Sequence, residues 1–122
     1  MIKGTIENRE AIVELQVSGP VQSPRQVEAA IDTGYNGYLT LPGDIVSTLQ
    51  LSFAGHRRAT LADGSVTRLD VYLASVIWHG RDTEVLISQT AGAPLIGMAL
   101  LEGNRLTIDV TAGGEVSIEE LP

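Results

Sequence analysis

Apolar and polar residues alternate along most of this chain, and alternation with a period of two is typical of half-buried β-strands. Clusters of Gly, Pro, Asn and Asp, the residues that favour turns, separate the alternating runs. The pattern predicts strands at residues 4–10, 11–19, 25–32, 37–42, 57–62, 65–78, 83–88, 105–110 and 115–121. In the second of these strands we expect Ile12, Leu15 and Val17 to face the core.

Three of the turns between these strands have a clear basis in the sequence. Asp63-Gly64 separates two alternating runs, and Asp-Gly in that setting is among the stronger short signals for a β-hairpin. Residues 79–81 predict the next turn and residues 111–114 predict the last one. Neighbouring strands are therefore expected to pair as hairpins.

Two short segments break the alternation and predict helices. Residues 43–51 predict the first helix, with Asp44 as its N-cap. The apolar residues that share one face of this helix are Ile45, Val46 and Leu49. Residues 98–102 predict a second helix, which stops at Gly103. Many short strands with one or two short helices indicate an all-β, barrel-like architecture.

The composition is that of one ordinary folded domain, which we expect to span residues 1–122. Apolar residues make up 43% and charged residues 19% of the chain, a balance that argues against disorder. Aromatic residues make up only 4%, so the core must consist mainly of Val, Ile, Leu and Ala.

The charge of the chain disfavours a nucleic-acid partner. The formal net charge is −7, whereas binding to phosphates requires clustered Lys and Arg side chains. Arg57 and Arg58 are adjacent, but no aromatic residue is interleaved with them. We therefore expect no nucleic acid as a partner.

Cysteine and histidine usage offers no metal site. The chain has no cysteine, which excludes disulfides and thiolate ligands. The two histidines, His56 and His79, each stand beside a glycine at an expected turn, so a zinc ion would lack ligands. No Gly-x-Ser-x-Gly motif marks a nucleophilic serine. We expect neither a metal nor an organic cofactor.

No targeting or membrane segment is evident. The first ten residues are charged and lack the apolar run of a signal peptide. No stretch approaches the roughly 18 consecutive apolar residues that a membrane span requires. The expectation is a cytoplasmic protein with no membrane partner.

The segment "AIDTGYNGYLTLP" at residues 30–42 holds the candidate chemistry. Asp32-Thr33-Gly34 is weak evidence on its own, because Asp and Gly are ordinary turn residues. Apolar residues, however, run into Asp32 and continue from Leu39. A carboxylate held between buried strands is poorly solvated, and its charge costs free energy unless a partner shares it.

Two further segments strengthen the case, "LADGS" at residues 61–65 and "PLIGMALL" at residues 94–101. Together with "AIDTG" at residues 30–34, this ordered set resembles the retropepsin-like aspartic proteases of clan AA, in particular their small bacterial members. The match runs from about residue 25 to about residue 110. The resemblance implies a closed acid-protease barrel.

The resemblance also implies roles for individual residues. Asp32 would be the catalytic aspartate, the Thr33 hydroxyl would tie two active-site loops together, and the Gly34 N–H would support the carboxylate. The flap over the substrate would consist of Leu61, Ala62, Asp63, Gly64 and Ser65. The strand that packs beside the active-site loop would consist of Leu95, Ile96 and Gly97.

The chemistry that the resemblance implies needs two carboxylates. One is ionised and takes a proton from water, while the other is protonated and polarises the scissile carbonyl. The chain has one Asp-Thr-Gly, and Asp63 stands at the expected flap tip, too far along the hairpin to be the second acid. A symmetric homodimer that pairs Asp32 with its copy is the economical solution.

The chain departs from the viral members of the family at three places. Tyr35-Asn36-Gly37-Tyr38 follows the motif where viral enzymes usually have a small residue and an acid, which indicates a bulkier rim to the substrate pocket. The flap tip is not glycine-rich, so we expect a stiffer flap. The closing hairpin at residues 105–121 is longer than the usual viral ending.

These features favour an aspartic endopeptidase that is active as a homodimer and cleaves an extended peptide or protein substrate with apolar side chains near the scissile bond. The alternative is a catalytically silent dimeric module with the same fold, which binds a peptide without cutting it. A third interpretation, a purely structural β-domain, predicts a monomer with Asp32 exposed at a turn.

Overall fold

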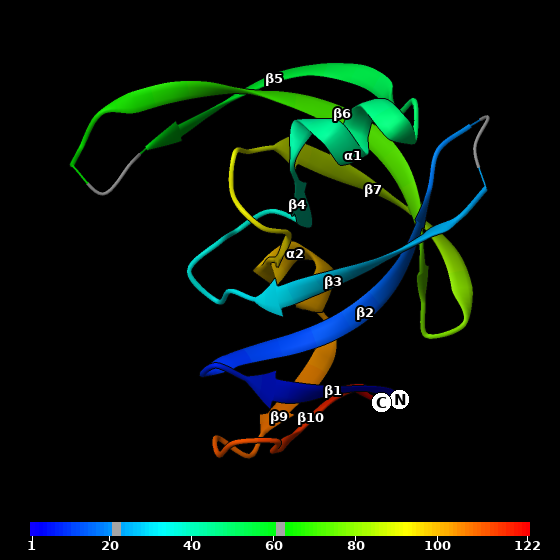
Figure 1. The fold of residues 1–122 in the computed structure, drawn as a ribbon, viewed down its shortest axis with the longest axis vertical. Helices are drawn as coiled ribbons and strands as arrows, with labels where there is room; N and C mark the ends of the chain where they lie inside the picture. Colours follow the sequence, from blue (N-terminus) through cyan, green and yellow to red (C-terminus); the bar gives the residue numbers. More distant parts are fainter. Residues whose placement is uncertain (21–22, 61–62) are drawn as a thin grey trace.

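The alternating runs form strands almost throughout, and two short helices interrupt them (Figure 1). The computed structural model describes residues 1–20, 23–60 and 63–122. Its strands are β1 (Ile2–Glu7), β2 (Glu10–Ser18), β3 (Arg25–Ile31), β4 (Leu39–Leu41), β5 (Ser52–Thr60), β6 (Val66–Trp78), β7 (Arg81–Gln89), β8 (Leu95–Ile96), β9 (Asn104–Ile108) and β10 (Glu115–Glu120). Its helices are α1 (Gly43–Thr48) and α2 (Met98–Leu101). The expected all-β class is therefore confirmed.

A subset of the strands closes into a barrel. The hydrogen-bonded order is β6-β7-β4-β8-β3-β2, and β2 pairs again with β6 to close the ring. The closing contact is short, with Val17 opposite Val76 and Ser18 opposite Ser75. Within the ring, β3 runs parallel to β8 and β4 runs parallel to β7, whereas the other pairs are antiparallel. Closure gives every strand of this ring a neighbour on both sides, whereas β5 and β9 remain the end strands of the whole sheet.

Two extensions leave the barrel (Figure 1). The β5–β6 hairpin reaches away from it, because only residues 71–78 of β6 pair with β7 while residues 66–73 pair with β5. On the other side, β1, β10 and β9 continue the sheet from β2. Ile2 lies opposite Ile118, so the two ends of the chain are side by side.

The inward face of β2 illustrates how the alternation builds the core. Ala11, Val13, Leu15 and Val17 are all buried, which confirms the expectation for the last two. The prediction that Ile12 faces the core is wrong, because this side chain is only half-buried. It stands one residue out of phase with the buried set, and successive side chains of a strand point to opposite faces.

The first expected helix is confirmed as α1, but its cap differs from the prediction. The N-cap residue is Pro42, which makes no side-chain capping bond, and Asp44 lies inside the first turn. A proline fixes its own φ near the value that a helix start needs, so the helix begins without a polar cap. The predicted apolar face is buried, as the exposed fractions of Ile45, Val46 and Leu49 show.

The second helix and the predicted turn after β6 are found as well. α2 is followed by Gly103, whose φ of 82° ends the helix in the left-handed region. His79 and Gly80 join β6 to β7 with φ values of 51° and 75°.

The prediction of a turn at His56 is wrong, because this residue lies within β5. The neighbouring Gly55 belongs to an irregularity in the pairing of β5 with β6, which explains a glycine inside a strand.

Candidate active site

Asp32 stands immediately after β3, where the strand ends and a tight turn begins. Its N–H donates a hydrogen bond of 2.9 Å to the carbonyl of Ile96, and its own carbonyl accepts one of 3.1 Å from the Tyr35 N–H. The carboxylate oxygen Oδ1 accepts a hydrogen bond of 2.9 Å from the Gly34 N–H. The Asp32 side chain is half-buried, whereas Thr33 and Gly34 are exposed. Backbone groups on both sides therefore hold this carboxylate in place.

The segment expected beside the Asp32 loop (residues 32–38) does lie next to it. β8 runs parallel to the end of β3, with Ile31 opposite Ile96. On the other side of β8, the buried hydroxyl of Thr40 accepts a hydrogen bond of 2.9 Å from the Leu95 N–H. Segments about sixty residues apart in the sequence are thus joined at one end of the barrel.

Backbone hydrogen bonds continue this junction into α2. The N–H groups of residues 97–99 donate in turn to the carbonyls of Tyr38, Tyr35 and Gly37, at 3.0, 2.8 and 3.1 Å. A Cβ atom on Gly97 would overlap the Gly37 carbonyl oxygen. Glycine is therefore the residue that permits so close an approach of the two backbones.

Tyr35 occupies a defined position in the Asp32 loop. Its hydroxyl donates a hydrogen bond of 3.1 Å to Oγ of Ser88, a buried residue of β7. The guanidinium carbon of Arg57 lies 5.7 Å from the centre of the Tyr35 ring. A Cβ atom on Gly37 would overlap the Tyr35 ring and hydroxyl, so the second glycine of the loop makes room for this tyrosine.

A hollow of about 410 Å³ lies between the Asp32 loop and the strands β5, β6 and β7, and we call it the tyrosine pocket. Its lining residues are Tyr35, Asn36, Gly37, Tyr38, Ala54, His56, Arg57, Val71, Leu86, Ser88 and Ala99. Both tyrosines that the sequence places at a pocket rim are in this set. Asp32 is not a lining residue, but the turn that begins at Asp32 leads directly into the pocket wall.

The tip of the β5–β6 hairpin carries the residues expected to form a flap. Asp63 accepts hydrogen bonds from the Ser65 hydroxyl at 2.6 Å and from the Ser65 N–H at 2.9 Å. These two bonds, the hydroxyl first, hold the pKa of Asp63 below its usual value. Gly64 between them has a φ of 85°. Leu61 and Ala62, also expected in the flap, lie outside the described residues.

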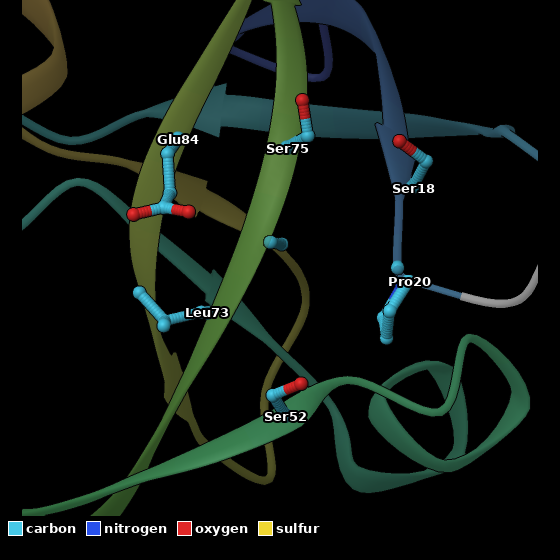
Figure 2. Close-up of a pocket in the computed structure, with 8 residues that line it drawn as sticks. Ser18, Pro20, Ser52, Leu73, Ser75 and Glu84 are labelled. Atoms are coloured by element: carbon cyan, nitrogen blue, oxygen red, sulfur yellow. The ribbon is translucent and has the colours of Figure 1, made fainter.

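A second hollow, of about 230 Å³, lies where β2 meets β6 (Figure 2). Its lining residues are Ser18, Gly19, Pro20, Ser52, Leu73, Ala74, Ser75 and Glu84. Val17 pairs with Arg25 at the start of β3, so this hollow lies at the opposite end of that strand from Asp32. Glu84 is its single titratable side chain, which offers no second acid or base for catalysis.

Other kinds of site find little support in the described part of the chain. Within residues 1–20, 23–60 and 63–122, no group of three or more His, Cys, Asp or Glu side chains is placed to hold a metal ion. No helix in these ranges is long and apolar enough to cross a membrane. His56 instead pairs with Asp70, Nδ1 to Oδ1, at 2.9 Å.

Arg57 and Ser88 are parts of the site that the sequence analysis missed. Each lies in an alternating strand that resembles any other half-buried strand. The available signal was the adjacency of Arg57 to Arg58, in a chain with only eight Lys and Arg residues. Nothing local marks Ser88, because its partner Tyr35 is 53 residues away.

Comparison with solved structures finds a likeness to the EIAV protease complexed with the inhibitor HBY-793. The alignment has a TM-score of 0.53 and 14% sequence identity, and it covers 78% of this chain and 88% of that chain. No protein-family model matches the chain, and no curated protein sequence matches it either.

The structural likeness confirms the retropepsin-like fold that the sequence predicts, a closed acid-protease barrel with two short helices. At 14% identity it is evidence about the fold rather than about activity. Membership among the small bacterial proteases, and the roles of individual residues, stay predictions.

Proposed function

We propose that this protein is an aspartic endopeptidase, active as a homodimer in which Asp32 of each subunit forms a carboxylate dyad. The observation that carries the proposal is the placement of Asp32. It lies at the end of β3, hydrogen-bonded to the backbone of β8 through its N–H and to Gly34 through its carboxylate, in a retropepsin-like barrel.

The dimer follows from the need for two carboxylates. The chain contains one Asp-Thr-Gly sequence, so the second acid must come from a second copy. Thr33 and Gly34 are exposed in a single subunit, which leaves this turn accessible to its counterpart. Two carboxylates a few ångströms apart cannot both ionise easily, and the pair therefore shares one proton.

The shared proton supports hydrolysis without a covalent intermediate. The ionised carboxylate removes a proton from water, whose oxygen attacks the scissile carbonyl carbon while the protonated carboxyl donates to the carbonyl oxygen. Collapse of the tetrahedral intermediate breaks the C–N bond, and the leaving nitrogen takes a proton from the dyad. The hydrogen bond from the Gly34 N–H to Oδ1 of Asp32 would hold the carboxylate in position in both subunits alike.

The β5–β6 hairpin would hold the substrate in an extended conformation. It projects from the barrel, and β5 is an end strand of the sheet, with backbone groups on one side that pair with no other described strand. An extended peptide can bind such an edge through main-chain hydrogen bonds.

The test is cleavage of a peptide library by the wild type and by Asp32→Asn. We expect the substitution to lower kcat/KM by about a thousandfold or more, because the amide can neither take the proton nor share it. Asp82→Asn, at an exposed position of β7, makes the same chemical change elsewhere and should leave cleavage unchanged.

Two other outcomes would change the assignment. Cleavage that survives in Asp32→Asn would remove Asp32 from the mechanism. Binding of peptides without cleavage by a confirmed dimer, from about pH 3 to about pH 8, would favour the catalytically silent binding module instead.

A further inference from the structure

The tyrosine pocket combines apolar walls with an arginine that forms no ion pair within the described part of the chain. Val71, Leu86 and Ala99 supply aliphatic surface, and the rings of Tyr35 and Tyr38 supply aromatic surface. None of the eleven lining residues is an acid, whereas Arg57 and His56 are basic. The pocket therefore differs in charge from the chain as a whole, whose net charge is −7.

Of the two basic residues, Arg57 is the one available to a ligand. His56 is engaged by Asp70, which lies 2.9 Å from its Nδ1 and is not a lining residue. The ion pairs formed among the described residues do not include Arg57. The Arg57 side chain is half-buried, so its charge is less screened by solvent than that of a fully exposed arginine.

Within residues 1–20, 23–60 and 63–122, no side-chain hydrogen bond involves the Arg57 guanidinium. Its central carbon lies 5.7 Å from the centre of the Tyr35 ring, and Tyr35 is itself anchored by the hydrogen bond to Ser88. An arginine that packs over an aromatic face still points its N–H groups outward in the guanidinium plane. That planar set of donors matches the two oxygens of a carboxylate.

We propose that the tyrosine pocket is a side-chain subsite that selects an acidic residue of the peptide, with Arg57 as the specificity-determining residue. Glutamate fits better than aspartate, because its longer stem places methylene groups against the aliphatic wall. That this residue lies near the scissile bond rests on the proposed function, since the turn at Asp32 leads into the pocket wall.

The negative net charge of the protein should restrict the preference for Glu to one position of the bound peptide. A net charge of −7 disfavours acidic residues at most positions of a bound peptide. In the tyrosine pocket, the positive charge of Arg57 favours an acidic side chain instead. One peptide position should therefore accept Glu, while the same substitution at other positions weakens binding.

The experiment compares matched peptides that differ by Glu or Gln at one position, scanned along the sequence. Binding is measured on Asp32→Asn, which retains the pocket, and cleavage is measured on the wild type. At one position we expect Glu to be favoured over Gln by about five- to tenfold, the usual difference between a hydrogen bond to a charged group and one to a neutral group. Arg57→Gln should abolish this preference.

A matched control and a variant with reversed charge make the test specific for Arg57. Arg58→Gln removes the same charge from the next residue, which lines a separate hollow with Val66, Thr67 and Arg68, and it should keep the preference. Arg57→Glu should instead favour Lys at the selected position. A reversed preference demonstrates a folded pocket and cannot arise from loss of structure.

The outcomes separate this proposal from the proposed function. Cleavage with no position that favours Glu, or a Glu preference that survives in Arg57→Gln, overturns the subsite and leaves the endopeptidase intact. Arg57-dependent binding of Glu peptides without cleavage supports the subsite and contradicts the endopeptidase. Absence of both binding and cleavage contradicts both.

Discussion

At the scale of single residues, the position of Asp32 depends on how closely two backbone segments approach each other. The N–H of Gly97 donates to the Tyr38 carbonyl at 3.0 Å, and the next two N–H groups bond the same loop. A side chain at residue 97 would displace the carbonyl of Gly37 and the ring of Tyr35. The geometry of the carboxylate is therefore coupled to a residue that carries no chemistry of its own.

Gly97→Ala should lower the free energy of unfolding by about 2–3 kcal/mol, because the added methyl group meets backbone that cannot move aside cheaply. Urea unfolding measures this change. Gly92→Ala is the control, since a Cβ there meets nothing within 4 Å, and it should change stability by less than about 0.5 kcal/mol. Equal stability of the two variants would contradict the close approach at Gly97.

At the scale of the elements, the described residues at the tip of the β5–β6 hairpin, 63–65, form a turn that is exposed to solvent. Asp63, Gly64 and Ser65 are all exposed, and the Ser65 hydroxyl and N–H both donate to the Asp63 carboxylate. These bonds favour the ionised carboxylate, so they lower the pKa of Asp63. The turn is therefore stabilised above the unfolded pKa of Asp63, and the contribution is lost as the pH falls through the folded value.

Ser65→Ala should raise the pKa of Asp63 toward its usual range, because the variant removes the donor with the larger effect. The carboxyl carbon shift of Asp63, followed by NMR against pH, measures the change. Thr67→Ala is a control on the same hairpin and should leave that titration unchanged. An Asp63 titration that does not move in Ser65→Ala would show that the hydroxyl bond is not maintained in solution.

At the scale of the whole molecule, the proposed site is complete only in a dimer. In the proposed dimer each subunit has a net charge of −7, and the dyad would bring two of these negative charges close together when both carboxylates are ionised. Apolar contacts across the interface must outweigh this repulsion. Protonation of the dyad relieves part of it, so association and pH are linked.

Dimer association should weaken as the pH rises from about 5 to about 9, because the proton shared by the two carboxylates is lost. Sedimentation at constant salt concentration measures the association constant. Asp32→Asn is the control, since its dimer lacks the shared proton and should show a smaller dependence on pH. An association constant that strengthens steadily over this range would contradict the dyad.

Much of the strand pattern could be predicted, because the alternation of apolar and polar residues within a strand indicates which of its side chains face the core. The two arms of the opening hairpin, the β6–β7 turn and the helix after Gly97 follow from alternation and turn residues alone. The errors at Ile12, Asp44 and His56 have local causes. Ile12 is one residue out of phase with the buried side chains of β2, and Pro42 stands at the N-cap of α1 in place of Asp44. The glycine beside His56 belongs to an irregularity in a strand instead of a turn.

The sequence by itself determined most of the residues that face inward, most of the turns, and that one Asp-Thr-Gly lies at the end of an apolar run. Only the tertiary structure decided that β8 lies parallel to β3, that β2 meets β6 to close the barrel, and that Arg57 lies over Tyr35. The physical reason is that alternation specifies the faces of a strand but not its neighbour. Neighbours are selected by long-range packing, and the pocket exists only where the packed segments meet.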